Sequence, residues 1–232
     1  MKNIKLPKRI QAIAEMVIIE EPVADIGADH ALLPCYLTAN RVVPRAIVGE
    51  LTAGPYQRAC STVYRYGLHR LVEVRQGDGL EVLKPGEVST VVMAGMGGNT
   101  INEIILAAGE KVESFKRLVI QPQNALKEVR TLIANKGWPI TDERIVYDHD
   151  YYSIMVVCPE SGEPYSLTDL EAMFGPRILE RTEESLIRDY LCFYINKFSG
   201  IKERIQVEGG KDAQQEKQYY MDLVDRLEEV LR

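Results

Sequence analysis

Short apolar runs and amphipathic segments alternate along the first 160 residues of this chain. The apolar runs predict β-strands, and Val88 to Ala94 has the near-continuous apolar pattern of a strand that is buried on both faces. The amphipathic segments carry apolar residues every three or four positions and predict helices. The predicted strands are 23–26, 45–49, 71–75, 88–94, 118–120, 143–147 and 152–157, and the predicted helices are 4–18, 31–37, 55–66, 101–108 and 126–135.

The regular alternation of strands and helices predicts a parallel sheet with helices on both faces. The last two strands, around Asp148-His149-Asp150, predict an antiparallel pair that closes one edge. The expected fold class is therefore α/β, with the Rossmann-like doubly wound sheet that is typical of class I methyltransferases rather than of dinucleotide dehydrogenases.

After a polar linker at Glu160 to Pro164 the strand signals stop. Apolar residues then recur at spacings of three and four from Leu186 to Ile205 and again from Tyr220 to Val230, with Gly209-Gly210 between the two stretches. This pattern predicts a helical hairpin that resembles a short antiparallel coiled coil. We expect two domains, residues 1–160 and residues 161–232.

Acidic residues and glycines stand where the first predicted strand ends, in Asp25-Ile26-Gly27-Ala28-Asp29-His30. In parallel α/β sheets, ligands bind at the carboxyl ends of the strands. Gly27 allows a close approach of the backbone to a ligand, but Asp29 stands where a dinucleotide-binding loop has a second glycine. Asp25 and Asp29 repel a diphosphate and attract a ligand with a sulfonium and an ammonium group, which favours S-adenosylmethionine over NAD.

The next three strands end in equally distinctive residues. Glu50 ends the second strand, where an acidic residue accepts ribose hydroxyls, and Asp78 follows the third, where it can accept from an adenine amino group. Gly95-Met96-Gly97-Gly98 follows the fourth strand and predicts a floor of small residues where donor and acceptor meet.

Each of these residues has a plainer interpretation on its own. Asp29 and His30 are also suited to capping the next helix, Asp78 to a turn, and Met96 to filling the core. Their succession at four strand ends of one chain favours a ligand site.

These motifs, in the same order, resemble those of the bacterial tRNA (adenine-22, N1)-methyltransferase family. The matching segments are residues 23–31 with Leu33-Pro34, residues 49–50 with 54–57, and residues 77–80, 93–98 and 121–124. Together they extend over the whole predicted α/β domain. It implies cofactor contacts from Asp25, Gly27, Glu50, Asp78, Gly79, Ala94, Gly95 and Met96, and contacts with the target base from Gly97, Gln121 and Asn124. One departure is Leu32, where many relatives are expected to have an aromatic residue; Tyr56 and Tyr151 are possible substitutes.

The chemistry that the resemblance implies is methyl transfer to N1 of an adenine in tRNA. This nitrogen has a free in-plane lone pair, so the enzyme mainly has to align donor and acceptor and accommodate a cationic product. Asp29 and His30 are the candidate catalytic residues, with Asp29 as an electrostatic stabiliser. The Asp/Asn-Pro-Pro-aromatic motif of enzymes that act on exocyclic amino groups is missing after the fourth strand, which disfavours N6-methylation.

Binding of tRNA requires cations for its phosphates. Lys2, Lys5, Lys8 and Arg9 are candidates, although a solvated helix start explains them equally well. The net charge of −6 argues against a general nucleic-acid coat. Two other interpretations stay open: a methyltransferase for a small molecule or protein, and a non-catalytic RNA-binding scaffold with this fold. A nicotinamide dehydrogenase is disfavoured by the acidic first turn.

Four cysteines without a C-x-x-C pair predict free thiols rather than metal ligands or disulfides. We expect no metal. No apolar run approaches the length of a membrane helix and no signal peptide is evident, so we expect a cytoplasmic protein without a membrane partner. The sequence leaves the oligomeric state open, with a monomer favoured.

Overall fold

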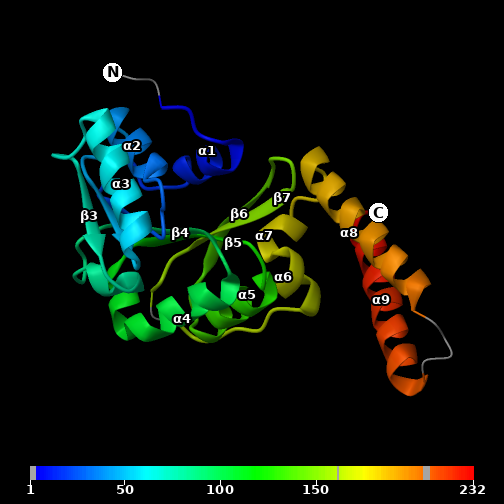
Figure 1. Ribbon diagram of the computed structural model, residues 1–232. Coiled ribbons are helices and arrows are strands. Elements are labelled where there is room, and N and C mark those ends of the chain that lie inside the picture. The colour runs from blue at the N-terminus through cyan, green and yellow to red at the C-terminus, as the bar shows by residue number, and fades with distance from the viewer. Residues whose placement is uncertain (1–3, 161, 206–209) are drawn as a thin grey trace.

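The computed structural model describes residues 4–160, 162–205 and 210–232. Its centre is a seven-stranded sheet in the order β3-β2-β1-β4-β5-β7-β6 (Figure 1). The strands are β1 Val23–Ile26, β2 Ala46–Glu50, β3 Val72–Gln76, β4 Thr90–Met96, β5 Arg117–Pro122, β6 Ile140–Tyr147 and β7 Tyr151–Val157. The helices are α1 Lys8–Ala14, α2 Leu32–Ala39, α3 Ala53–Tyr66, η1 Gly79–Val82, α4 Gly98–Ala108, η2 Gly109–Ser114, α5 Leu126–Asn135, α6 Asp169–Phe174, α7 Pro176–Leu179, α8 Ser185–Arg204 and α9 Gly210–Val230.

The first five strands are parallel, and β7 pairs antiparallel with both β5 and β6. The predicted α/β sheet with an antiparallel edge is confirmed. The chain runs outward from β1 to β2 and β3, and then returns to β4 on the other side of β1. The strand order therefore reverses between β1 and β4, and this reversal marks the ligand crevice of open α/β sheets.

Helices cover both faces of the sheet, and each face has its own apolar core. Side chains of α1, α2 and α3 pack on one face, and those of α4 and α5 pack on the other. Because β1 and β4 are buried on both faces, their side chains are mostly apolar, as the sequence pattern predicted.

The helix predicted over 4–18 is wrong at both ends. Only Lys8–Ala14 is helical, and Pro7 takes an extended conformation before it. A residue that precedes a proline is disfavoured in a helix, so the turn cannot begin before Pro7. Met16 and Val17 follow the helix and are nevertheless buried in the core, which explains why the apolar spacing continues past its end.

Two short helices that the sequence did not indicate, α6 and α7, cover a fully buried ion pair. Arg130 Nε lies 2.8 Å from Glu143 Oε1, and both side chains are inaccessible to solvent. The Arg130 guanidinium also donates to the carbonyls of Ala172 and Met173, and Glu143 accepts from the backbone N–H of Arg177. These bonds attach the segment after the linker to β6 and α5.

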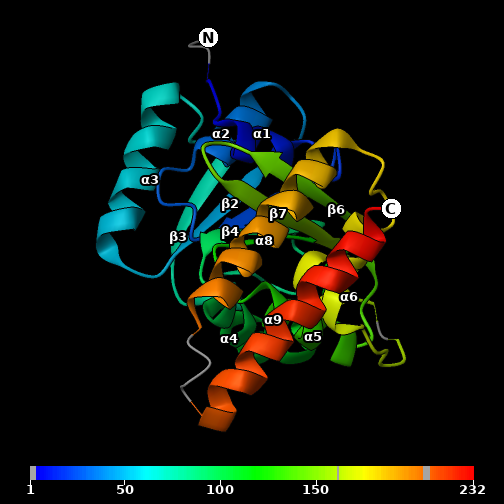
Figure 2. The same cartoon turned by 90° about the vertical axis from the view of Figure 1, so that its right-hand side faces the viewer.

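The last two helices form the predicted hairpin, which lies at the β6 and β7 side of the sheet, away from β3 (Figures 1 and 2). Its apolar residues make a third core with α6, α7 and Ile145 of β6. Phe174, Tyr190, Tyr194 and Phe198 contribute a cluster of edge-to-face and tilted ring contacts. Residues 206–209, which include Gly209 of the predicted break, lie outside the described residues.

Candidate active site

Two cavities open side by side at the carboxyl ends of the parallel strands. The first, of about 410 Å³, lies between the end of β2, the loop after β3 and α4, and is called the β2–α4 cavity. The second, of about 300 Å³, lies between α1, the loop after β1 and the end of β4, and is called the α1–β4 cavity. Gly27 lines both, so the two cavities meet at the end of β1.

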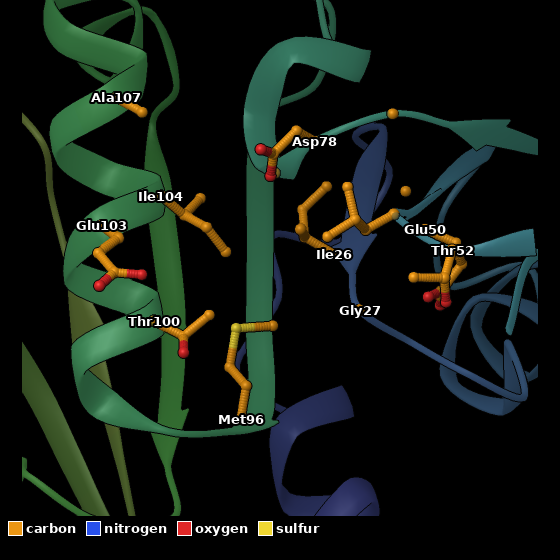
Figure 3. Close-up of a pocket in the computed structure, with 14 residues that line it drawn as sticks. Ile26, Gly27, Glu50, Thr52, Asp78, Met96, Thr100, Glu103, Ile104 and Ala107 are labelled. Carbon is orange, nitrogen blue, oxygen red and sulfur yellow. The ribbon is translucent and has the colours of Figure 1, made fainter.

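The β2–α4 cavity has a helical wall and a strand-end wall (Figure 3). Thr100, Glu103 and Ile104 project from α4 toward the strand ends, and Asp78 and Glu50 lie across from that helix. The cavity therefore combines apolar surface with three carboxyl groups.

Two glycines keep the β2–α4 cavity open. Gly27 has φ +72°, and a Cβ atom there would lie 2.7 Å from Met96 Cε. Gly79 has φ +47°, and a Cβ atom there would lie 3.0 Å from Ile104 Cγ2. Both positions need the left-handed backbone that glycine adopts without strain, and both let the main chain approach a ligand closely.

Glu50 is buried at the end of β2, with 4% of its surface exposed. Burial raises the pKa of its carboxyl group, and a hydrogen bond from the Asp29 backbone N–H, 2.5 Å from Glu50 Oε1, opposes that rise. The backbone N–H of Ala28 also donates to this carboxylate. A carboxylate has about four acceptor sites, so the group keeps acceptor capacity toward the cavity that it lines.

Asp25 is a second buried carboxyl group and lines the α1–β4 cavity. Burial, together with the charge of Glu50, raises its pKa to about 7, while the charge of Arg9 acts in the opposite direction. A ligand with hydroxyl donors and positive charge would stabilise both carboxylates, and the pair therefore fits a cationic nucleoside such as S-adenosylmethionine.

Asp29 and His30 also line the α1–β4 cavity. Asp29 has φ +50°, and its carboxylate accepts from Arg58 Nε at 2.7 Å and lies 3.3 Å from His30 Nε2. Ala31, and not Asp29 or His30, is the N-cap residue of α2, and no side chain caps that helix. The helix-cap interpretation of Asp29 and His30 is therefore wrong.

The TrmK family model, described as tRNA (adenine(22)-N(1))-methyltransferase, matches residues 23–229. The chain belongs to this family. Its activity is the S-adenosylmethionine-dependent methylation of N1 of adenine 22 in tRNA, which decides against the small-molecule, scaffold and dehydrogenase interpretations.

Individual relatives agree with the TrmK family model over nearly the whole chain. The chain is 34% identical to the tRNA (adenine(22)-N(1))-methyltransferase of Bacillus subtilis, across 98% of this chain and 96% of that protein. The crystal structure of the B. subtilis m1A22 tRNA methyltransferase superposes with a TM-score of 0.86 at 31% identity, with 99% and 100% of the two chains covered. A Streptococcus pneumoniae relative in complex with S-adenosyl-L-methionine gives a TM-score of 0.82 at 29% identity over 98% and 100%.

In this TrmK-family chain the predicted cofactor residues divide between the two cavities. Gly27, Glu50, Asp78, Gly79 and Met96 line the β2–α4 cavity. Asp25, Gly27, Ala94 and Gly95 line the α1–β4 cavity.

The residues predicted to border the target base lie outside both cavity walls. Gln121 is fully buried, donates to the Pro122 carbonyl and accepts from the Arg9 guanidinium. The side-chain carbonyl of Asn124 accepts from the Gly98 backbone N–H at 3.1 Å, and Gly97 lies next to it as the N-cap residue of α4. Their visible contacts position Arg9 and the start of α4.

The basic residues near the N-terminus have different surroundings in the structure. Arg9 lines the α1–β4 cavity, where its guanidinium lies 5.2 Å from the ring centre of Tyr152. Lys5 and Lys8 are exposed beside it, and Lys2 lies outside the described residues. Arg9 thus belongs to the cavity wall, a position that its place in a basic stretch did not indicate.

Leu32 lines the α1–β4 cavity at the position where an aromatic residue was expected. Neither suggested substitute does so. Tyr56 lies on α3 outside both cavity walls, and Tyr151 contacts the rings of Tyr190 and Phe193 near the hairpin.

One wall of the β2–α4 cavity was not predicted from the sequence. Thr100, Glu103, Ile104 and Ala107 line it from α4, and Thr52 lines it beyond β2. The spacing of the four α4 residues places them on one helix face, but that signal becomes informative only once α4 is known to border the cavity.

No group of three or more His, Cys, Asp or Glu side chains that can hold a metal occurs among the described residues. Within the same residues, no helix is long and apolar enough to cross a membrane.

Proposed function

We propose that the two cavities divide the binding of the reactants between them, with the methyl donor in the β2–α4 cavity and adenine 22 of tRNA entering the α1–β4 cavity. The observation that carries this proposal is the meeting of the two cavities at Gly27, with Asp25 and Glu50 buried on either side. Donor and acceptor then approach each other at the end of β1.

Glu50 accepts the ribose hydroxyls of the cofactor, and Asp78 accepts from its adenine amino group. Asp25 faces the positively charged amino acid part, and Gly27 and Gly79 give the cofactor room against the main chain. When bound, S-adenosylmethionine supplies an electrophilic methyl group on a sulfonium sulfur. The acidic lining suits this cation because Asp25 and Glu50 otherwise bury negative charge.

No residue has to act as a base toward N1 of adenine, because its lone pair is free at neutral pH. The contribution of the protein is alignment of the acceptor in the α1–β4 cavity. Methylation leaves a cationic adenine ring, and Asp29 at the cavity wall is positioned to stabilise that charge. Three residues contribute indirectly, by positioning Arg9 and the start of α4: Gly97, Gln121 and Asn124. His30 orients the Asp29 carboxylate.

An adenine of folded tRNA has to turn outward to enter such a cavity. Lys5 and Lys8 lie exposed beside Arg9 and are suited to phosphates near the entrance. We assign cofactor binding and chemistry to residues 1–160 and an accessory role in tRNA binding to residues 161–232. The protein acts as a monomer in the cytoplasm, where tRNA is modified.

Methylation of two transcripts of one tRNA tests the assignment. The first carries adenine at position 22 and the second carries guanine there, and the modified position is mapped by reverse-transcription stops and nucleoside mass spectrometry. We expect 1-methyladenosine in the first transcript and no methylation in the second. Equal methylation of both, or N6-methyladenosine as product, would contradict the assignment.

A further inference from the structure

An open groove of about 500 Å³ follows α3 beside the α1–β4 cavity. Its hydrogen-bonding side chains include those of His30, Gln57, Arg58, Ser61 and Arg65, and no acidic residue lines it. His30 also lines the α1–β4 cavity, so the groove and the cavity share a wall.

The groove lies on a stretch of this acidic chain that contains arginines and no acidic residue. Residues 51–72 contain Arg58, Arg65 and Arg70 and no Asp or Glu, whereas the whole chain has a net charge of −6. Arg58 and Arg65 both line the groove, and Arg70 does not. This local charge favours an anionic ligand at this place.

Arg58 is paired with Asp29, and an anionic ligand can take the place of Asp29 in this pair. Its Nε and Nη2 atoms both contact the same oxygen of Asp29, at 2.7 Å and 2.5 Å. The side chains of Arg58 and Asp29 are 49% and 46% exposed, and ion pairs that are half exposed contribute little to stability. A phosphate offers the guanidinium two oxygens in parallel, which is the stronger arrangement.

We propose that the α3 groove binds a phosphate of the RNA substrate next to the target nucleotide, through Arg58 and Arg65. This rests on the proposed function, because the phosphates that flank a base accompany it to the mouth of the α1–β4 cavity. When Arg58 turns to the phosphate, the Asp29 carboxylate is released beside that cavity. The Asp29 backbone stays in place through its hydrogen bond to Glu50.

The first test compares Arg65→Gln with Arg70→Gln, which removes the same charge outside the groove. The dissociation constant for tRNA is measured at several salt concentrations, and calorimetry gives the S-adenosylmethionine affinity. We expect Arg65→Gln to weaken tRNA binding about 3- to 10-fold and to reduce the salt slope by roughly 0.7–0.9, as for one lost phosphate contact. Arg70→Gln should bind tRNA like the parent, and cofactor affinity should change in neither. An Arg65→Gln protein with parental affinity and slope would overturn the proposal.

The second test identifies the phosphate. Neutral methylphosphonates replace the phosphates on either side of nucleotide 22, and one of them should weaken binding to the parent but not to Arg58→Gln or Arg65→Gln. If neither replacement weakens binding while inorganic phosphate shifts the arginine side-chain NMR signals of the groove, the groove is a free-anion site and the proposal is wrong. Methyl transfer to adenine 22 is measured with the parent protein in parallel, so failure of the groove and failure of the proposed function give different results.

Discussion

The backbone N–H of Asp29 donates a hydrogen bond of 2.5 Å to Glu50 Oε1 and so ties the loop after β1 to the end of β2. The two residues line different cavities, Glu50 the β2–α4 cavity and Asp29 the α1–β4 cavity. One contact therefore joins the proposed cofactor site to the proposed acceptor site.

Glu50→Ala should weaken S-adenosylmethionine binding at least about 100-fold. The variant loses two charge-assisted hydrogen bonds to the ribose, each worth about 1.5–3 kcal/mol. Glu50→Gln keeps an acceptor for the Asp29 N–H and should lose less. Calorimetric titration measures both, with Glu110→Ala, an exposed residue outside both cavities, as the control. Unchanged affinity in Glu50→Ala would remove Glu50 from the site.

Asp25 should make the free protein less stable as the pH rises from about 4 to 7. Its pKa is about 7 in the folded protein against an ordinary 3.8, so the folded state binds the proton more tightly. This contribution is complete below the ordinary pKa and is lost as the pH passes through 7. About three pKa units correspond to at most about 4 kcal/mol. Urea unfolding between pH 5 and 8 should show the decline in the parent and a flatter profile in Asp25→Asn; parallel profiles would contradict the assignment.

Asp29→Asn should slow methyl transfer on the order of 100-fold at saturating cofactor, by analogy with the loss of one preorganised electrostatic group. The asparagine keeps the backbone N–H that Glu50 accepts, so cofactor affinity should stay near that of the parent. Single-turnover transfer to tRNA measures the rate. A variant that transfers methyl at the parental rate would leave Asp29 with a structural role only.

Arg130→Met should cost about 3–5 kcal/mol of unfolding free energy, because Glu143 would stay buried without its partner. Adding Glu143→Leu should recover much of the loss. Arg144→Met removes a partly exposed pair with Glu15 and should cost about 1 kcal/mol or less. Chemical unfolding compares the three, and equal losses in Arg130→Met and Arg144→Met would show that burial of the pair is unimportant.

A chain that ends at Glu184 should bind S-adenosylmethionine but methylate tRNA poorly, because it lacks the hairpin of α8 and α9. It retains α6 and α7, whose backbone groups accept from Arg130 and donate to Glu143, whereas a chain that ends at Glu163 loses these bonds and the cover over the buried pair. Thermal unfolding with and without cofactor checks that the shortened protein is folded. Full tRNA activity in the folded protein would exclude an accessory role of the hairpin.

The alternation of strands and helices, the acidic and glycine-rich strand ends and the helical hairpin could all be predicted from the sequence. These features depend on local spacing: side chains repeat every two residues in a strand and about every 3.6 in a helix. The carboxyl ends of parallel strands meet at one edge, so Asp25, Glu50 and Asp78 could be placed together without coordinates.

Only the tertiary structure decided how those residues divide between two cavities and which partners they take. Arg9 meets Gln121 across 112 positions of the chain, and Arg58 meets Asp29 across 29. Neither contact has a local signal, because both depend on where whole helices pack against the sheet. The same holds for Arg130 and Glu143, whose burial follows from α6 and α7 closing over them. Local periodicity therefore determined most helices and strands of this protein, although not α6 and α7, whereas packing between distant elements determined the shape and charge of its site.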